Sequence, residues 1–213
     1  TKMKSYAFEN AEKAFLKAVL LLEREPSQHE ALTNSYRNLC KLNLERKNKQ
    51  MALHYFEKAK HTFEKIPNPN PRKKAQFYFD EANMLFKQRE ITASSLAIER
   101  VFKTLIPAYS SAKTVLPNQS ALYAETILLD VLDLQAELFL AQSQPKKALE
   151  SYALAFHIEA LFQSLLVYEN SKIIIQIRNR NRTERCIAIY QSLFQKENKK
   201  NYLESAFLLA EKT

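Results

Sequence analysis

The densest group of chemically active residues is a basic run at 178–185, where four arginines stand among asparagine, threonine and glutamate. On a helix, Arg178, Arg182 and Arg185 share one face, whereas Arg180 points elsewhere. Three guanidinium groups on one face could contact the phosphates of a nucleic acid or the carboxylates of an acidic protein. The run contains no aromatic side chain on which a base could stack. A solvated face is therefore the first interpretation, an acidic partner the second and a nucleic acid the third.

The cysteines and histidines form no pattern that supports catalysis or metal binding. His54 and His61 share a helix face, but no carboxylate is placed as a third ligand and no HExxH sequence occurs. Cys186 and His157 could be paired, yet nothing in the sequence supplies an oxyanion hole. We therefore predict no catalytic residue, no metal ligand and no cofactor, and we expect Cys40 and Cys186 to be buried packing residues.

The chain of 213 residues contains no glycine and no tryptophan. Gly-rich phosphate loops, dinucleotide fingerprints, EF-hand turns and nucleophile elbows all need glycine where a Cβ atom would clash. Two-residue hairpin turns also depend on glycine. The composition thus excludes several classes of enzyme and disfavours a meander of tight β-hairpins.

The overall charge and hydropathy describe a folded chain with a basic surface. Lysine and arginine exceed aspartate and glutamate by 32 to 23, which gives a net charge of +9. This charge permits anionic partners without selecting them. No run of about eighteen apolar residues is present, so no membrane span is predicted. Two distant cysteines and the lack of a signal peptide predict a reducing, cytoplasmic location. The missing first methionine suggests a piece of a longer chain.

Seven prolines divide the chain into stretches with helical periodicity. The stretch 170–197 contains the weak helix formers of 179–183, so the helix predicted there is either continuous or broken at these residues. Asparagine stands near several breaks, where glycine would usually end a helix, and is the next best residue for a left-handed cap. These asparagines are Asn48, Asn68, Asn70, Asn118 and Asn198. The predicted helices, about nine in all, lie at 4–24, 28–47, 49–65, 71–88, 90–106, 120–142, 145–166, 170–197 and 200–212.

One short pattern recurs along the chain: alanine, three residues, an aromatic residue, two residues, alanine. It occurs as Ala11-Phe15-Ala18, Ala52-Phe56-Ala59 and Ala148-Tyr152-Ala155. This pattern resembles the second helix of a tetratricopeptide repeat, in which small residues let two helices approach and the aromatic side chain fills the space beside them. The resemblance implies an all-α, right-handed superhelical solenoid of antiparallel helix pairs.

The first helices of the repeats can be placed by the same resemblance. Cys40, Ala82 and Ala136 take the small position where the family often has glycine, and Phe194 departs from it. Successive copies are about 42 and 54 residues apart instead of the family's usual 34, so the helices are longer and 107–119 is an insertion. We predict a single repeat domain over 1–213, composed of a half-repeat at 4–24 and repeats at about 28–65, 71–106, 120–166 and 170–212.

A narrower resemblance concerns the last third of the chain. The chain is similar here to the repeat arm that precedes the caspase-like peptidase domain of CHAT proteins. The similar segments are 146–152, 168–172, 201–207 and Ala210-Glu211-Lys212. The resemblance implies that a peptidase domain follows in the native reading frame. The 213-residue chain would then be the recognition or regulatory arm of a CHAT-type protease.

In repeats of this family the first helices line a concave face, and the resemblance places thirteen residues of this chain there. Nine of them are predicted to bind the partner: Asn34, Arg37, Asn38, Lys41, Phe79, Asn83, Asp130, Asp133 and Glu137. The other four on this face are Glu45, Gln76, Asp80 and Leu134. Arg37, Asn38 and Lys41 look like part of the set that grips a carboxylate in relatives that bind chaperone tails. The later repeats supply aspartate and glutamate instead, which puts binding of such tails in doubt. A groove that is basic at one end and acidic at the other suits an extended peptide of mixed charge or a neighbouring domain.

These patterns together predict a non-catalytic scaffold that binds a protein, an extended peptide or an adjacent domain of the same chain. The alternative is a helical repeat that binds nucleic acid through the arginines of 178–185. That alternative is the less favoured one, for the reason given above.

Overall fold

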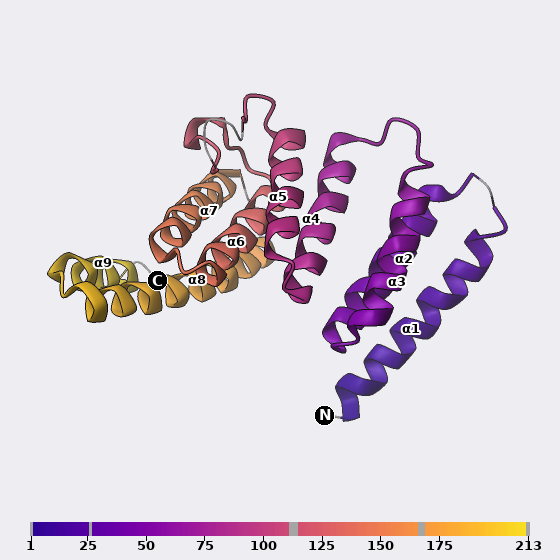
Figure 1. Cartoon of the computed structure of the whole chain (residues 1–213), viewed down its shortest axis with the longest axis horizontal. Helices are drawn as coiled ribbons and strands as arrows, with labels where there is room; N and C mark the ends of the chain where they lie inside the picture. The colour runs from indigo at the N-terminus through magenta and orange to yellow at the C-terminus, as the bar shows by residue number, and fades with distance from the viewer. Residues whose placement is uncertain (1, 26, 111–114, 166–168, 212–213) are drawn as a thin grey trace. The chain divides into compact units, whose positions relative to one another are not determined.

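A computed structural model of the chain describes residues 2–25, 27–110, 115–165 and 169–211, and the side chains of 8–25, 27–110, 115–163 and 178–211. All regular structure in these residues is helical, as predicted, and comprises nine α-helices and one 3₁₀ turn (Figure 1). The elements are α1 (Lys2–Leu22), α2 (His29–Glu45), α3 (Lys49–Phe63), α4 (Pro71–Gln88), α5 (Ile91–Leu105), η1 (Gln119–Ala121), α6 (Thr126–Ala141), α7 (Pro145–Leu165), α8 (Glu169–Glu197) and α9 (Lys200–Glu211).

The chain divides into two compact units, Thr1–Ser94 and Ser95–Thr213, so each is described by itself. In unit 1, α2 packs against α1, α3 and α4. Its core contains Leu39 and Phe56, and Phe77 stacks on Phe63 with ring centroids 4.3 Å apart. Stacked aromatic pairs stabilise a core beyond the area that they bury. The single continuous domain and its right-handed course stay predictions.

In unit 2, α6 packs along α7, α7 along α8, and α8 along α9. Helix α6 is apolar on nearly all sides, which is typical of a helix that is surrounded by others. Its buried Ala136 and Phe139 form a core with Tyr152 of α7 and with Cys186 and Leu193 of α8. This core fixes the faces that α6 and α8 turn toward each other.

The turns inside three helix pairs have the same geometry. Lys47, Arg89 and Ser143 each follow a first helix and have positive φ angles of 59°, 70° and 59°. After each of them, the next backbone N–H donates to a carbonyl five residues back, at 2.8–2.9 Å, which is the Schellman arrangement. The three positions are 42 and 54 residues apart, as the sequence repeat predicts. Neighbouring helix pairs therefore repeat in structure as well as in sequence.

The asparagines near the breaks perform two different tasks. Asn68 and Asn198 have positive φ, as predicted for residues that replace glycine at a helix end. Asn48, Asn70 and Asn118 instead begin helical segments, where their side chains accept hydrogen bonds from the backbone N–H of Met51, Arg72 and Ser120. Asparagine thus serves as both a C-terminal and an N-terminal cap in this glycine-free chain.

The start of α6 differs from the sequence prediction, and the structure of α8 decides between the two alternatives left open for 170–197. The prediction that the sixth helix begins near 120 is wrong, because Glu125 is extended and its side chain accepts from the N–H of Ile127, so that α6 begins at Thr126. Helix α8 runs unbroken through 179–183. Arg182 and Thr183 are buried there, and their packing outweighs the weak helix propensity of the segment.

The small residues of the repeat pattern are buried as expected. Cys40, Ala82 and Ala136 are at most 3% exposed, and Ser94 of the degenerate copy is fully buried, with its hydroxyl donating to the carbonyl of Ala82 at 2.8 Å. A larger side chain at these places would force neighbouring helices apart.

Both cysteines are expected to be inert in the folded chain. They are free and buried, and burial raises the pKa of each thiol to about 12. Thiolate is the reactive form, so iodoacetamide at pH 8 should label Cys40 and Cys186 at least ~100-fold more slowly in native than in denatured protein. Mass spectrometry of timed samples measures both rates, and native labelling at the rate of an unfolded peptide would contradict the packing described here.

Candidate functional site

The predicted concave face of unit 1 contains an ion-pair cluster that joins α2 to α4. The Nε of Arg37 donates to Oδ2 of Asp80 at 2.5 Å, and its Nη1 donates to Oδ1 of Asn34 at 2.8 Å. Lys41 Nζ lies 3.0 Å from Oδ1 of the same carboxylate. Arg37 and Lys41 of α2 therefore meet on Asp80 of α4, another residue that the repeat pattern places on the concave face, and Asn34 joins the cluster through Arg37.

Asp80 is a structural anion. Its side chain is 5% exposed, whereas that of Lys41 is 46% exposed and that of Arg37 is 14% exposed. Gln76, one turn earlier on α4, donates to Oδ1 of Asp80 at 3.3 Å. A carboxylate so removed from water requires these charged partners. The repeat pattern predicts both Gln76 and Asp80 on the concave face, but it does not predict that Asp80 is buried between two cations of α2.

Beside this cluster lies a cavity of about 300 Å³ in unit 1. Asn34 and Arg37 line it, while Phe63 and Ile66 give it an apolar wall. The other lining residues are Glu30, Thr33, Pro67, Asn68, Pro69, Asn70 and Lys73. Apolar walls with a few polar groups are typical of binding pockets, and this volume is at the small end of their range. The cavity can hold one or two side chains of a peptide.

An exposed ion pair stands at the rim of the cavity. Lys73 Nζ of α4 lies 2.5 Å from Oε1 of Glu30 on α2, and both side chains are more than half exposed. Such a pair contributes at most about 1 kcal/mol. A ligand that brings its own carboxylate or ammonium group can therefore replace one partner at little cost.

The loop 66–70 forms the cavity wall between α3 and α4. Two of its residues, Pro67 and Pro69, have fixed φ angles, and Asn70 caps the first turn of α4. The loop is thus restrained before any ligand binds, which lowers the entropy lost on binding. The sequence signal was the alternation of proline and asparagine, which we interpreted only as a break between helices.

The remaining predicted residues of unit 1 do not line the cavity. Asn38, Phe79 and Asn83 are half-buried residues of α2 and α4. Of the predicted groove residues of unit 1, Asn34 and Arg37 line this cavity, and the binding role of the others stays a prediction.

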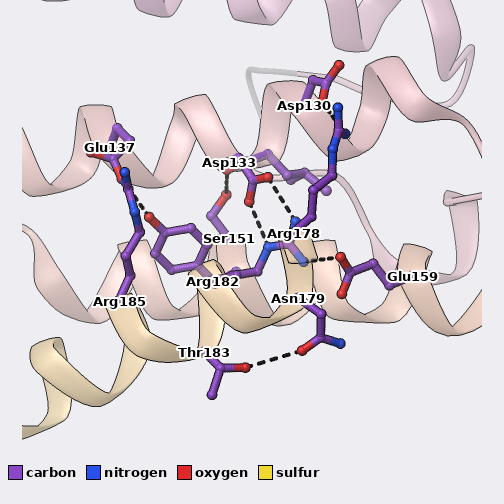
Figure 2. A network of polar contacts seen from close by, with 12 residues as sticks. Asp130, Asp133, Glu137, Ser151, Glu159, Arg178, Asn179, Arg182, Thr183 and Arg185 are labelled. Atoms are coloured by element: carbon purple, nitrogen blue, oxygen red, sulfur yellow. Dashed lines mark hydrogen bonds and ion pairs between the residues drawn. The ribbon is translucent and has the colours of Figure 1, made fainter. Parts of the chain in front are cut away.

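In unit 2, the predicted groove acids and the predicted basic patch meet each other. Arg178 Nη1 lies 2.6 Å from Oδ1 of Asp130, Arg182 pairs with Asp133, and Arg185 pairs with Glu137 (Figure 2). We call these three pairs the arginine ladder. The three acids are spaced three and four residues apart on α6, and the three arginines are spaced four and three residues apart on α8. Each set therefore lies on one face of its helix, and consecutive turns of the two helices face each other.

Arg182 is the centre of the ladder. Its Nε and Nη2 donate to the two oxygens of Asp133 at 2.7 and 2.8 Å, the bidentate geometry that arginine forms with carboxylates. Its Nη1 lies 2.6 Å from Oε1 of Glu159 on α7, an ion pair without the geometry of a hydrogen bond. The guanidinium carbon is 5.2 Å from the ring centroid of Phe156. One side chain therefore links α8 to α6 and α7.

Glu159 is the residue that the sequence reasoning missed in unit 2. It is 1% exposed, and in the described part of the chain its Oε2 has no hydrogen-bond partner. Burial raises the pKa of this carboxyl, and the charge of Arg182 partly offsets the rise. A signal was present: Glu159 follows Ala148, Tyr152 and Ala155 at helical spacing, so it continues a buried stripe.

The arrangement corrects the first interpretation of the basic run. Arg182 is 3% exposed, so it does not belong to a solvated face, whereas Arg180 is exposed and pairs with Glu184. Arg178 and Arg185 are half-exposed and hold carboxylates of α6. The predicted basic patch and the predicted acidic groove are two sides of one internal contact.

Neither a metal-binding cluster nor a membrane-spanning helix is found in the residues that the structure describes. No group of three or more histidine, cysteine or acidic side chains is arranged to hold an ion there. None of the described helices is long and apolar enough to cross a bilayer.

Comparison with known proteins gives a likeness of fold. No family model matches the sequence, and no curated protein matches it. Among solved structures, the chain is similar to BtubC (BKLC) from P. vanneervenii, with a TM-score of 0.53 and 16% sequence identity over 95% of this chain and 81% of that one. At this identity the likeness concerns the all-helical fold alone.

Proposed function

We propose that the chain is a non-catalytic scaffold that binds an extended peptide along α2 and α4 of unit 1. The observation that carries the proposal is the cavity of about 300 Å³ at the face that the repeat pattern had indicated, with Asn34 and Arg37 in its lining. Its apolar wall would accept a peptide side chain, and its polar rim would fix the direction of the peptide.

The ligand class follows from the charges around the cavity. Asp80 already neutralises Arg37 and Lys41, so neither is the principal contact for a ligand. Lys73 and Glu30 are the exposed charges of opposite sign at the rim. A segment with an apolar residue next to an acidic one would place the first in the cavity and pair the second with Lys73.

The basic run gives little support to nucleic acid as the ligand. Its three co-facial arginines hold Asp130, Asp133 and Glu137, and phosphate would have to compete with these carboxylates. The phosphate contacts that dominate nucleic-acid affinity would be correspondingly few.

The finer proposal is that this scaffold is a tetratricopeptide-type arm of a CHAT-type protease in the cytoplasm. Free, buried thiols at Cys40 and Cys186 suit a reducing compartment. The reading frame beyond Thr213 tests the association: a caspase-like peptidase domain there would support it, and an immediate stop codon would remove it.

Peptide binding is tested with a random library of displayed ten-residue peptides, selected on the 213-residue chain. We expect enriched peptides to share an acidic residue beside an apolar one. Lys73→Glu should then weaken the best peptide at least ~10-fold, about 1.4 kcal/mol, by calorimetry, because it removes the rim cation and places a second carboxylate beside Glu30.

The matched control is Lys103→Glu, since Lys103 is likewise half-exposed and paired with a glutamate, but lies on α5 in unit 2. It should leave the affinity unchanged. Failure to enrich any peptide, or equal affinity for Lys73→Glu and wild type, would count against the groove.

A further inference from the structure

Helices α1 and α9 each expose an apolar stripe. In unit 1, α1 packs one side against α2, yet Leu20 and Leu21 are 62% and 58% exposed and Leu16 is also exposed. In unit 2, α9 packs one side against α8, yet Phe207 and Leu208 are 63% and 57% exposed, with Leu203 beside them. Contiguous exposed apolar side chains on a helix face are typical of an interaction surface.

The two stripes have the same spacing. The exposed face of α1 carries Lys13, Leu16, Lys17, Leu20 and Leu21, continued by Arg24 in the turn after the helix. The exposed face of α9 carries Lys200, Leu203, Glu204, Phe207, Leu208 and Glu211. Both sets follow i, i+3, i+4, i+7, i+8 and i+11, so each is a continuous stripe along one side of a helix.

The charges of the two stripes are complementary. Three basic residues accompany the leucines on α1, whereas two of the three charged residues on α9 are the acids Glu204 and Glu211. The face of α1 also carries one acid, Glu9, and the face of α9 carries one base, Lys200. The face of α1 is therefore basic on balance and the face of α9 is acidic. A stripe of this kind repels a copy of itself and attracts the other stripe. The favoured contact is therefore α1 against α9.

We propose that α9 of one molecule docks on α1 of a second copy, with the leucines of α1 against Leu203, Phe207 and Leu208. Lys17 and Arg24 of α1 would pair with Glu204 and Glu211 of the other copy. Such an interface is heterologous, because each molecule offers two different surfaces. It leaves one stripe uncovered at each end of any open assembly, so further copies can add. The inference does not depend on the peptide groove.

The test is the mass of the 213-residue chain in solution. Sedimentation equilibrium of wild type should show a mass that rises above the monomer's 24.8 kDa with concentration. Leu20→Glu and Phe207→Glu should each weaken self-association at least ~10-fold, because each places a charge in the centre of one stripe. Leu96→Glu, at an equally exposed leucine on α5, is the control and should associate as wild type.

Mixing the two defective variants distinguishes this interface from others. Leu20→Glu retains an intact α9 and Phe207→Glu an intact α1, so an equimolar mixture should form a dimer and stop there. Circular dichroism of each variant verifies that it is folded, as expected for substitutions at exposed positions. A wild-type chain that remains monomeric up to about 1 mM, or a mixture that forms no dimer, would overturn the proposal.

Discussion

Replacement of Arg182 by methionine is expected to destabilise unit 2 by ~3–5 kcal/mol, the range for removal of one partner from a buried ion pair. The arginine is 3% exposed and faces Asp133 and the fully buried Glu159. Methionine fills a similar volume but leaves Glu159 without its cation. Urea denaturation monitored by circular dichroism measures the loss, and a change below about 1 kcal/mol would contradict the geometry of the ladder.

A second substitution separates lost charge pairing from lost packing. In Arg182→Met/Glu159→Leu no buried charge remains, and Asp133, which is 37% exposed, can be hydrated. We expect the double variant to recover most of the stability, because a buried ion pair can often be replaced by apolar residues at no loss. Arg180→Ala breaks only the exposed pair with Glu184 and should cost less than about 0.5 kcal/mol.

The deficit of Arg182→Met, meaning its loss in free energy of unfolding relative to wild type, should also depend on pH. Burial raises the pKa of Glu159 above its ordinary value of 4.5, and loss of Arg182 raises it further. The folded variant then holds a proton that the unfolded chain has released, so its stability falls as the pH rises above 4.5. Compared with wild type, the deficit should be largest at pH 7 and should shrink toward pH 4.5. A deficit that is constant over this interval would mean that Glu159 does not carry the effect.

Replacement of Arg37 by leucine is expected to destabilise unit 1 by ~3 kcal/mol, the lower end of the same range. Asp80 is buried, and Arg37 is its less exposed cationic partner, at 2.5 Å. The loss is limited because Lys41 remains 3.0 Å from the carboxylate. Denaturation of the whole chain, with a probe in unit 1 such as acrylodan on a cysteine introduced at the exposed Lys60, measures the change.

Lys41→Leu is the matched control, because it removes the other cation from the same carboxylate. Lys41 is 46% exposed and screened by water, so its loss should cost under about 1 kcal/mol. Equal effects of the two substitutions would show that Asp80 does not depend on Arg37. The comparison also bears on binding experiments: a variant at Arg37 alters the fold of the groove, whereas one at Lys73 alters only its rim.

The predictable part of the fold is local. Proline and asparagine predicted the helix ends, and the alanine–aromatic–alanine pattern predicted which faces are buried, as Phe56 and Tyr152 confirm. The error at the start of α6 arose because the side chain of Glu125 caps the helix, although glutamate is not among the usual capping residues. The lining of the cavity in unit 1 was predicted in part: Asn34 and Arg37 of α2 were predicted as groove residues, whereas Glu30, Thr33 and the lining residues of 63–73 were not.

The helices, the turns between them and the small residues at their contacts could be predicted from the amino-acid sequence alone. These properties depend on residues within a few turns of one another, where helical periodicity and backbone sterics act directly. The pairing of Arg178, Arg182 and Arg185 with the acids of α6, 48 or 49 residues earlier, depends on how the helices pack and could not be predicted in this way. Periodicity shows which residues share a face, but several oppositely charged faces were available, and the packing of α6, α7 and α8 selected one.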